Sequence, residues 1–200
     1  VNVAIESGED VIAALQMLPY PMTFCGEVIN TAYISGACTH PDFRNRGIMN
    51  NLLSQAFARM LRNQVAVSTL IPAEPWLFDY YARSGYAPVF NYGKVSVEAS
   101  KPFFTQETSE LKVTNVYPDE AYAYLNRKLR EHACCIQHTQ ADYQVILADL
   151  QLGGGYVYTL EQNNKISALA IAYPSENNSW QISELLSDTS ETRSLLLHHL

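Results

Sequence analysis

The chain passes from a strand to a helix through Thr39-His40-Pro41-Asp42-Phe43-Arg44-Asn45-Arg46-Gly47-Ile48-Met49-Asn50-Asn51-Leu52-Leu53. The first turn of a helix has unpaired N–H groups and a positive dipole end, and Gly47 lets an anion approach the backbone closely. Arg44 and Arg46 add positive charge at the same place. The stretch therefore predicts a phosphate-binding loop. An ordinary loop-to-helix junction with solvated arginines is the alternative.

Part of this stretch, Arg44-Asn45-Arg46-Gly47-Ile48-Met49, resembles the Arg/Gln-x-x-Gly-x-Gly/Ala signature of the GNAT superfamily of acetyl-CoA-dependent N-acetyltransferases. In that family the amides of the loop hold the pyrophosphate of coenzyme A. Met49 stands where the signature has Gly or Ala, and the branch of enhanced intracellular survival acetyltransferases also carries a larger residue there. The resemblance implies acetyl-CoA as the acyl donor. It implies as cofactor-binding residues Ala37, Cys38, Thr39, Arg44, Asn45, Arg46, Gly47, Ile48, Met49 and Asn50.

A second motif, Phe78-Asp79-Tyr80-Tyr81-Ala82-Arg83-Ser84-Gly85-Tyr86, resembles the Leu-Tyr-Glu-Lys-x-Gly-Phe segment of GNAT enzymes. Aligning the Gly-aromatic ends implies that Tyr81 is the general acid that protonates the leaving thiolate of coenzyme A. A phenol suits this role because its reference pKa of about 10 lies near that of a thiol. Tyr80 is a weaker candidate. The ordinary alternative is that both tyrosines are packing residues.

The other catalytic roles are less well defined. Glu27, His40 and Glu74 are the candidates for a base that accepts the proton of the amine, and none is favoured. In the related branch a chain-terminal carboxylate has this role, but Leu200 does not resemble a natural terminus. Cys38 as a nucleophile would give an acyl-enzyme, although its apolar strand favours a buried, inert thiol.

The composition limits the class of protein. The chain has 200 residues, of which 48% are hydrophobic, and a net charge of −7. These values predict a folded core, argue against nucleic acid as a partner, and favour a cationic acceptor such as an amine. The four cysteines form no zinc-binding pattern, so we expect no metal and a reducing, cytoplasmic location. No apolar run approaches the roughly 20 residues of a membrane span, so no membrane association is expected.

Hydrophobic periodicity predicts an α/β (α+β) protein with two units. In residues 1–99 we expect helices over 46–62 and 76–83. The strands expected there cover 1–7, 11–17, 22–24, 28–29, 31–38, 65–71 and 86–97, with Pro19-Tyr20-Pro21 ending the second. After a linker over 100–110, the elements expected in 111–200 are a strand (111–117), helices (119–132 and 141–152), strands (156–161, 165–173 and 180–186) and a helix capped by Ser190 or Thr192.

The order of these elements resembles the mixed-sheet GNAT (acyl-CoA N-acyltransferase) fold twice, which is the tandem arrangement of the enhanced intracellular survival branch. The first unit lacks the opening strand and helices of the family, and the chain ends inside a helix, so we expect both ends to be cut from a longer protein. In the second unit, the stretch 186–193 is acidic and free of glycine. We therefore expect this degenerate second unit not to bind coenzyme A.

The resemblance implies direct transfer of an acetyl group from acetyl-CoA to an amine of an unidentified acceptor. The alternative is a non-catalytic acyl-CoA sensor or scaffold that keeps the fold. A third interpretation is an acyltransferase with a bulkier donor or an aminoacyl substrate. A homo-oligomer is compatible with the sequence.

Overall fold

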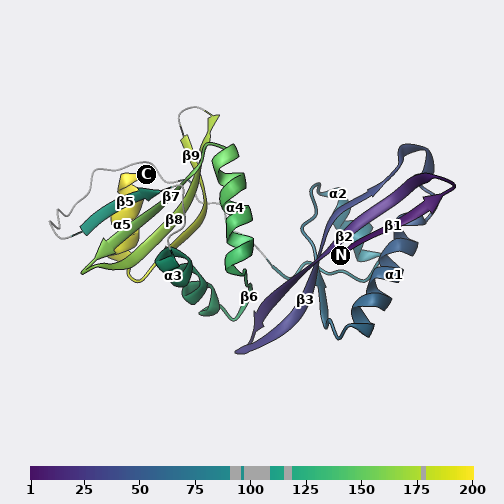
Figure 1. Ribbon diagram of the computed structural model, residues 1–200, viewed down its shortest axis with the longest axis horizontal. Coiled ribbons are helices and arrows are strands. Elements are labelled where there is room, and N and C mark those ends of the chain that lie inside the picture. Colours follow the sequence, from purple (N-terminus) through teal and green to yellow (C-terminus); the bar gives the residue numbers. More distant parts are fainter. Residues whose placement is uncertain (91–95, 97–108, 115–118, 177–178) are drawn as a thin grey trace. The chain divides into compact units, whose positions relative to one another are not determined.

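The computed structural model describes residues 1–90, 96, 109–114, 119–176 and 179–200 (Figure 1). The chain forms two compact units: Val1–Lys94 with Ala133–Ile136, and Val95–His132 with Gln137–Leu200. The predicted ranges (1–99, 100–110 and 111–200) place residues 133–136 in the second unit, whereas these residues lie in the first. Residues 100–108 of the predicted linker lie outside the described residues.

The first unit is a mixed sheet with helices. Its elements are β1 (Asn2–Ser7), β2 (Asp10–Phe24), β3 (Glu27–Thr39), the 3-10 helix η1 (Pro41–Phe43), α1 (Ile48–Arg62), β4 (Val67–Thr69), α2 (Trp76–Ala82) and β6 (Cys134–Ile136). The strand order is β1-β2-β3-β4, and β6 pairs with β2. All pairs are antiparallel except β3–β4, which is parallel. The predicted α/β class with a mixed sheet is confirmed.

Helix α1 covers one face of this sheet (Figure 1). Alternate residues of β2 and β3 point to the helix, where they pack against α1 residues that lie on one face of the helix. The buried residues of this core are Ala13, Leu15, Met17, Ala32, Ile34, Met49, Leu52, Leu53, Ala56 and Met60. Burying each large aliphatic side chain contributes about 1.5–3 kcal/mol, so this interface fixes where α1 begins relative to the sheet.

The long hairpin β2–β3 corrects one expectation, because Pro19 and Pro21 do not end a strand. Both lie inside the 15-residue strand β2, opposite Ala32 and Asn30 of β3. On its other side, β2 pairs with β1 only as far as Gln16 and with β6 only from Met22. Between these points β3 is the one described strand that pairs with β2, so a residue without an N–H group is tolerated.

Two other predicted strands are shorter in the structure. β4 covers three residues of the run expected over 65–71. Residues 86–90 are not in a strand, and residues 91–95 and 97 lie outside the described residues. Helix α2 ends at Ala82, one residue before its expected end.

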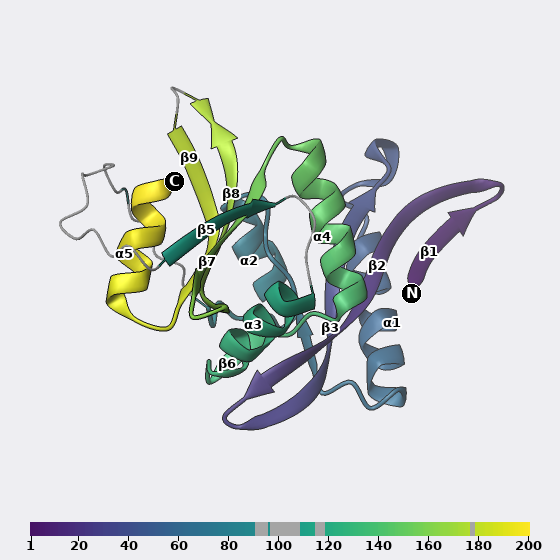
Figure 2. The same ribbon diagram turned by 60° about the vertical axis from the view of Figure 1, so that its left-hand side comes forward.

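The second unit is an antiparallel sheet between helices. Its elements are β5 (Ser109–Thr114), α3 (Asp119–Arg130), α4 (Gln140–Leu152), β7 (Tyr156–Gln162), β8 (Lys165–Ser175), β9 (Ser179–Ser187) and α5 (Ser190–His199). The strand order is β5-β7-β8-β9. Figures 1 and 2 show α5 on one face of this sheet and α3 and α4 on the other. Ala168, Ala170 and Ala172 of β8 are fully buried in a core with Leu196 of α5.

The starts of α4 and α5 are set by side-chain caps. Thr139 accepts a hydrogen bond from the backbone N–H of Asp142 and begins α4, and Thr189 does the same with Thr192 for α5. The cap of α5 is therefore Thr189 rather than the expected Ser190 or Thr192, because Thr192 is its partner three residues later. Among the described residues, no helix combines the length and the apolar character needed to cross a membrane.

Candidate active site

The edge of β3 is open where cofactor contacts are expected. β4 pairs with β3 only at Thr31–Tyr33, while β3 continues to Thr39. In the described part of the chain, the residues from Ile34 to Thr39 therefore pair with β2 alone. Because backbone N–H and C=O groups need partners, this edge can bind an extended ligand.

A β-bulge lies in the same segment. Ser35 pairs with Gln16 and Cys38 with Ala14, so Gly36 and Ala37 lie opposite the single residue Leu15. Gly36 has a φ of +59°, a left-handed conformation that glycine adopts at little cost. Bulges redirect the backbone beside active sites, and this one directly precedes Cys38 and Thr39. Sequence reasoning missed the bulge, although an isolated glycine in a strand is a signal for one.

The predicted phosphate loop connects β3 to α1 and is held by its own residues. The Arg44 Nε donates a hydrogen bond of 3.1 Å to the Thr39 carbonyl oxygen. The guanidinium of Arg46 lies over the ring of Phe43, 5.2 Å from its centroid. The His40 ring meets the same ring edge-on, with 5.8 Å between the two centroids. Both arginines are exposed. The loop thus orders two cations beside the start of a helix.

Gly47 forms the turn into α1. It has a φ of +74° and caps the helix without a side-chain hydrogen bond. Apart from its chain neighbours, no described atom lies within 4 Å of the place where a Cβ would sit. The turn at Gly47 therefore leaves room for an anion beside the first turn of α1, where helices have unpaired N–H groups that bind phosphate.

Met49 does not obstruct this loop. Its side chain is 8% exposed and packs in the core with Leu52 and Leu53. The larger residue in place of Gly or Ala therefore fills the core, and Met49 offers a ligand only its backbone N–H. Ile48 is partly buried, and Asn45 and Asn50 are exposed.

Cys38 corrects another expectation, because its side chain is exposed and not buried. It lies after the bulge at the end of β3, and beside it is an open pocket of about 310 Å³. The pocket is lined by Val11–Ala14 and Cys38–Pro41. Among the described residues, no group of three or more His, Cys, Asp or Glu side chains is placed to hold a metal ion.

Tyr81 lies in an aromatic cluster at the end of α2. Its ring contacts those of Tyr80 and Tyr86 edge-on, at centroid distances of 5.3 and 5.8 Å. Burial, followed by the electrostatic influence of Tyr80 and of Tyr33, raises the pKa of the Tyr81 phenol above its usual value. Tyr81 is partly buried and packs against the core that contains Ala32 and Ile34 of β3, the strand whose last residue paired with β4 is Tyr33.

The candidate bases differ in position. Glu27 begins β3 at the end opposite to Thr39, and 12 steps of about 3.3 Å separate them, or roughly 40 Å. His40 is exposed in the loop, where its Nδ1 accepts a hydrogen bond of 3.4 Å from the Asp42 N–H. Glu74 is exposed just before α2.

Comparisons with known proteins agree with this geometry. Residues 2–89 match the sequence model described as an acetyltransferase (GNAT) domain. The family resemblance drawn from the sequence is thus confirmed over these residues, which contain Tyr81 and the ten residues predicted to bind the cofactor.

Solved structures match nearly the whole chain. The fold is similar to that of a probable N-acyltransferase from Enterococcus faecalis V583 (TM-score 0.74, 15% identity, 99% of this chain and 50% of that one). It is also similar to that of a GCN5-related N-acetyltransferase from Anabaena variabilis (TM-score 0.73, 14% identity, 99% of this chain and 52% of that one). A third match is Eis1 from Mycobacterium abscessus (TM-score 0.68, 12% identity, 99% of this chain and 53% of that one). These identities show the fold alone, and the chain spans about half the length of these proteins. No curated protein matches the chain.

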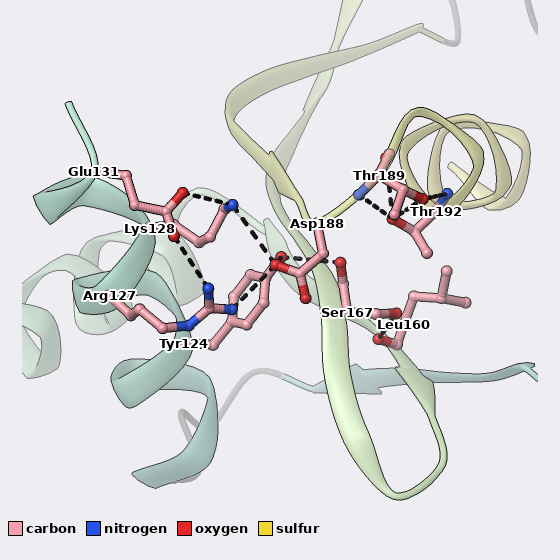
Figure 3. A network of polar contacts seen from close by, with 9 residues as sticks. All are labelled: Tyr124, Arg127, Lys128, Glu131, Leu160, Ser167, Asp188, Thr189 and Thr192. Carbon is pink, nitrogen blue, oxygen red and sulfur yellow. Dashed lines mark hydrogen bonds and ion pairs between the residues drawn. The ribbon is translucent and has the colours of Figure 1, made fainter.

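The second unit has a different junction at the place that corresponds to the phosphate loop. Only Asp188 and Thr189 separate β9 from α5, and neither is glycine. The Asp188 Oδ1 accepts hydrogen bonds from Arg127 Nη2 (3.0 Å) and the Tyr124 hydroxyl (3.4 Å), and Lys128 Nζ lies 3.6 Å away (Figure 3). An internal carboxylate therefore neutralises the cations near this helix start. This arrangement supports the prediction that the second unit does not bind coenzyme A.

The Asp188 network gives a stability prediction. Asp188→Asn keeps the shape of the side chain but removes its charge, so we expect the free energy of unfolding to fall by about 1 kcal/mol, as partly exposed ion pairs contribute little more. Glu176→Gln, at an exposed carboxylate just after β8, serves as the control and should leave the unfolding midpoint unchanged. Denaturant titration measures both. A midpoint for Asp188→Asn equal to that of the native chain would contradict the prediction.

Proposed function

We propose that the chain is part of an N-acetyltransferase that transfers an acetyl group directly from acetyl-CoA to an amine. The observation that carries the proposal is the order of features along β3: an open edge, a bulge, and an arginine-bearing loop that ends in Gly47 at the start of α1. The edge is suited to the pantetheine arm and the loop to the pyrophosphate. Tyr81 packs against the core that includes Ala32 and Ile34 of β3, on either side of the last residue paired with β4.

Acetyl-CoA supplies an activated acyl group, and transfer to an amine replaces its C–S bond with a C–N bond. In this proposal, Arg44, Arg46 and the first-turn N–H groups of α1 hold the phosphates. Backbone N–H groups of the bulged segment polarise the thioester carbonyl. Tyr81 gives its phenolic proton to the departing sulfur, and the amine releases its proton to water. We assign no protein base.

Isothermal calorimetry with acetyl-CoA tests the proposal on the full chain. We expect one site with micromolar affinity, equivalent to about −8 kcal/mol. Turnover is then measured as thiol release in the presence of lysine methyl ester, spermidine and phenethylamine. Binding without turnover would support the sensor or scaffold, and a folded chain without binding would refute the proposal.

A further inference from the structure

Tyr86, four residues after the end of α2, is hydrogen-bonded to the sheet. The hydroxyl oxygens of Tyr86 and Ser68 lie 2.5 Å apart, and either can donate. Ser68 is the central residue of β4, where it pairs with Ala32 of β3. Gly85, with a φ of +92°, turns the chain so that Tyr86 can reach this strand. The bond therefore ties the end of the α2 segment to the strand pair that separates at the candidate site.

Tyr86 also contacts Tyr81 in two ways. Its backbone N–H donates a 3.3 Å hydrogen bond to the Tyr81 carbonyl oxygen. Its ring meets the Tyr81 ring at an interplanar angle of 76° with centroids 5.8 Å apart. On another side, the Tyr86 ring packs against Phe57 of α1 at 5.7 Å. Tyr86 thus links Tyr81 to β4 and to α1 at once.

Helix α2 is held to the first unit by the packing of Tyr80 and Tyr81 against the core between the sheet and α1. It has seven residues, none of them buried, and its N-cap residue Pro75 makes no side-chain hydrogen bond. A helix this short is marginally stable by itself and depends on tertiary contacts. Because displacement of a catalytic group by about 1 Å costs roughly 100-fold in rate, a contact that fixes Tyr81 affects turnover directly.

We propose that Tyr86, held by its hydrogen bond to Ser68, is a positioning residue that orients the Tyr81 phenol toward the leaving thiolate. The inference rests on the proposed function, since it assumes that Tyr81 is the general acid. In this proposal Tyr86 transfers no proton to the substrate, and its hydroxyl serves as the partner of Ser68. The proposal distinguishes the roles of two tyrosines that lie in one cluster.

Two single variants and their combination test this proposal. Tyr86→Phe and Ser68→Ala each remove the bond but keep the ring packing. We expect each to lower kcat about 10-fold, while the KM for acetyl-CoA and the calorimetric affinity change less than about twofold. The double variant should be no slower than either single variant, because all three lack the same bond. Ser68→Thr, which restores a hydroxyl, should recover most of the lost kcat.

Tyr122→Phe in the second unit is the matched control, because its hydroxyl donates a similar 3.0 Å bond to the His138 carbonyl oxygen. It should leave kcat unchanged. Unchanged kcat in Tyr86→Phe and Ser68→Ala, or additive losses in the double variant, would overturn the positioning role while the proposed function stands. Absence of turnover in the native chain with all three amines would overturn the enzymatic function and the positioning role together. Thermal unfolding confirms that each variant is folded.

Discussion

Gly47→Glu is expected to abolish acetyl-CoA binding. The substitution places a carboxylate in the open space before the first turn of α1, where the pyrophosphate is proposed to bind. Two like charges 4 Å apart repel by about 4 kcal/mol at an effective dielectric constant of 20, which corresponds to roughly 1,000-fold in affinity. The left-handed backbone at this position adds about 1–2 kcal/mol of strain for any residue with a Cβ.

A matched substitution separates the loss of binding from backbone strain. Gly26 lies in the β2–β3 turn, has a φ of +91°, and also has open space at the Cβ position. Gly26→Glu therefore brings similar strain and the same charge at the other end of β3. Calorimetry should show acetyl-CoA binding to Gly26→Glu and none to Gly47→Glu. Comparable affinity in the two variants would place the phosphate site elsewhere.

Tyr81→Phe is expected to lower kcat by about 100-fold, the usual contribution of a positioned general acid. The ring contacts with Tyr80 and Tyr86 remain, so affinity for acetyl-CoA should change little. Steady-state kinetics with the best amine of the panel, together with calorimetry, separates these two quantities. A variant that turns over as fast as the native chain would reduce Tyr81 to a packing residue.

The pH dependence of kcat in the native chain and in Tyr81→Phe gives a second measurement. Burial raises the pKa of the Tyr81 phenol, so the protonated, active form persists above the ordinary tyrosine value of about 10. If Tyr81 is the acid, kcat of the native chain should fall only at pH values above that. The residual kcat of Tyr81→Phe should show no such fall, since it has no phenol to ionise.

The helix α1 and its loop were predictable because their signals are local. Helical spacing from Leu52 to Leu61 and the Arg-x-Arg-Gly start lie within about 20 residues of sequence. The errors concern partners that are distant along the chain. From the sequence alone, Pro19 indicates the end of a strand. In the structure it is tolerated because β3 is the one described strand that pairs with β2 at that point. β6 has three residues and pairs with Met22–Phe24, more than 100 residues earlier, so no periodicity reveals it.

Site residues show the same division. Short motifs point to Arg46, Gly47 and Tyr81, and the roles that the motifs imply stay predictions. The exposure of Cys38 depends on a bulge whose partner is Leu15 of β2, which lies outside any local motif. The bond between Ser68 and Tyr86 likewise joins residues that no motif connects. Tertiary contacts of this kind fix orientation without leaving a pattern in the sequence.

The position of β6 affects how this chain can be cut, copied or recombined. Ala133–Ile136 belong to the first unit, although the helices on either side of them belong to the second. A gene fragment that ends before codon 133 would therefore encode an incomplete first unit, with the edge of β2 at Met22–Phe24 unpaired. Such an edge invites self-association. Evolutionary exchange of either half as an independent cassette is disfavoured for the same reason, and the two units are expected to be inherited together.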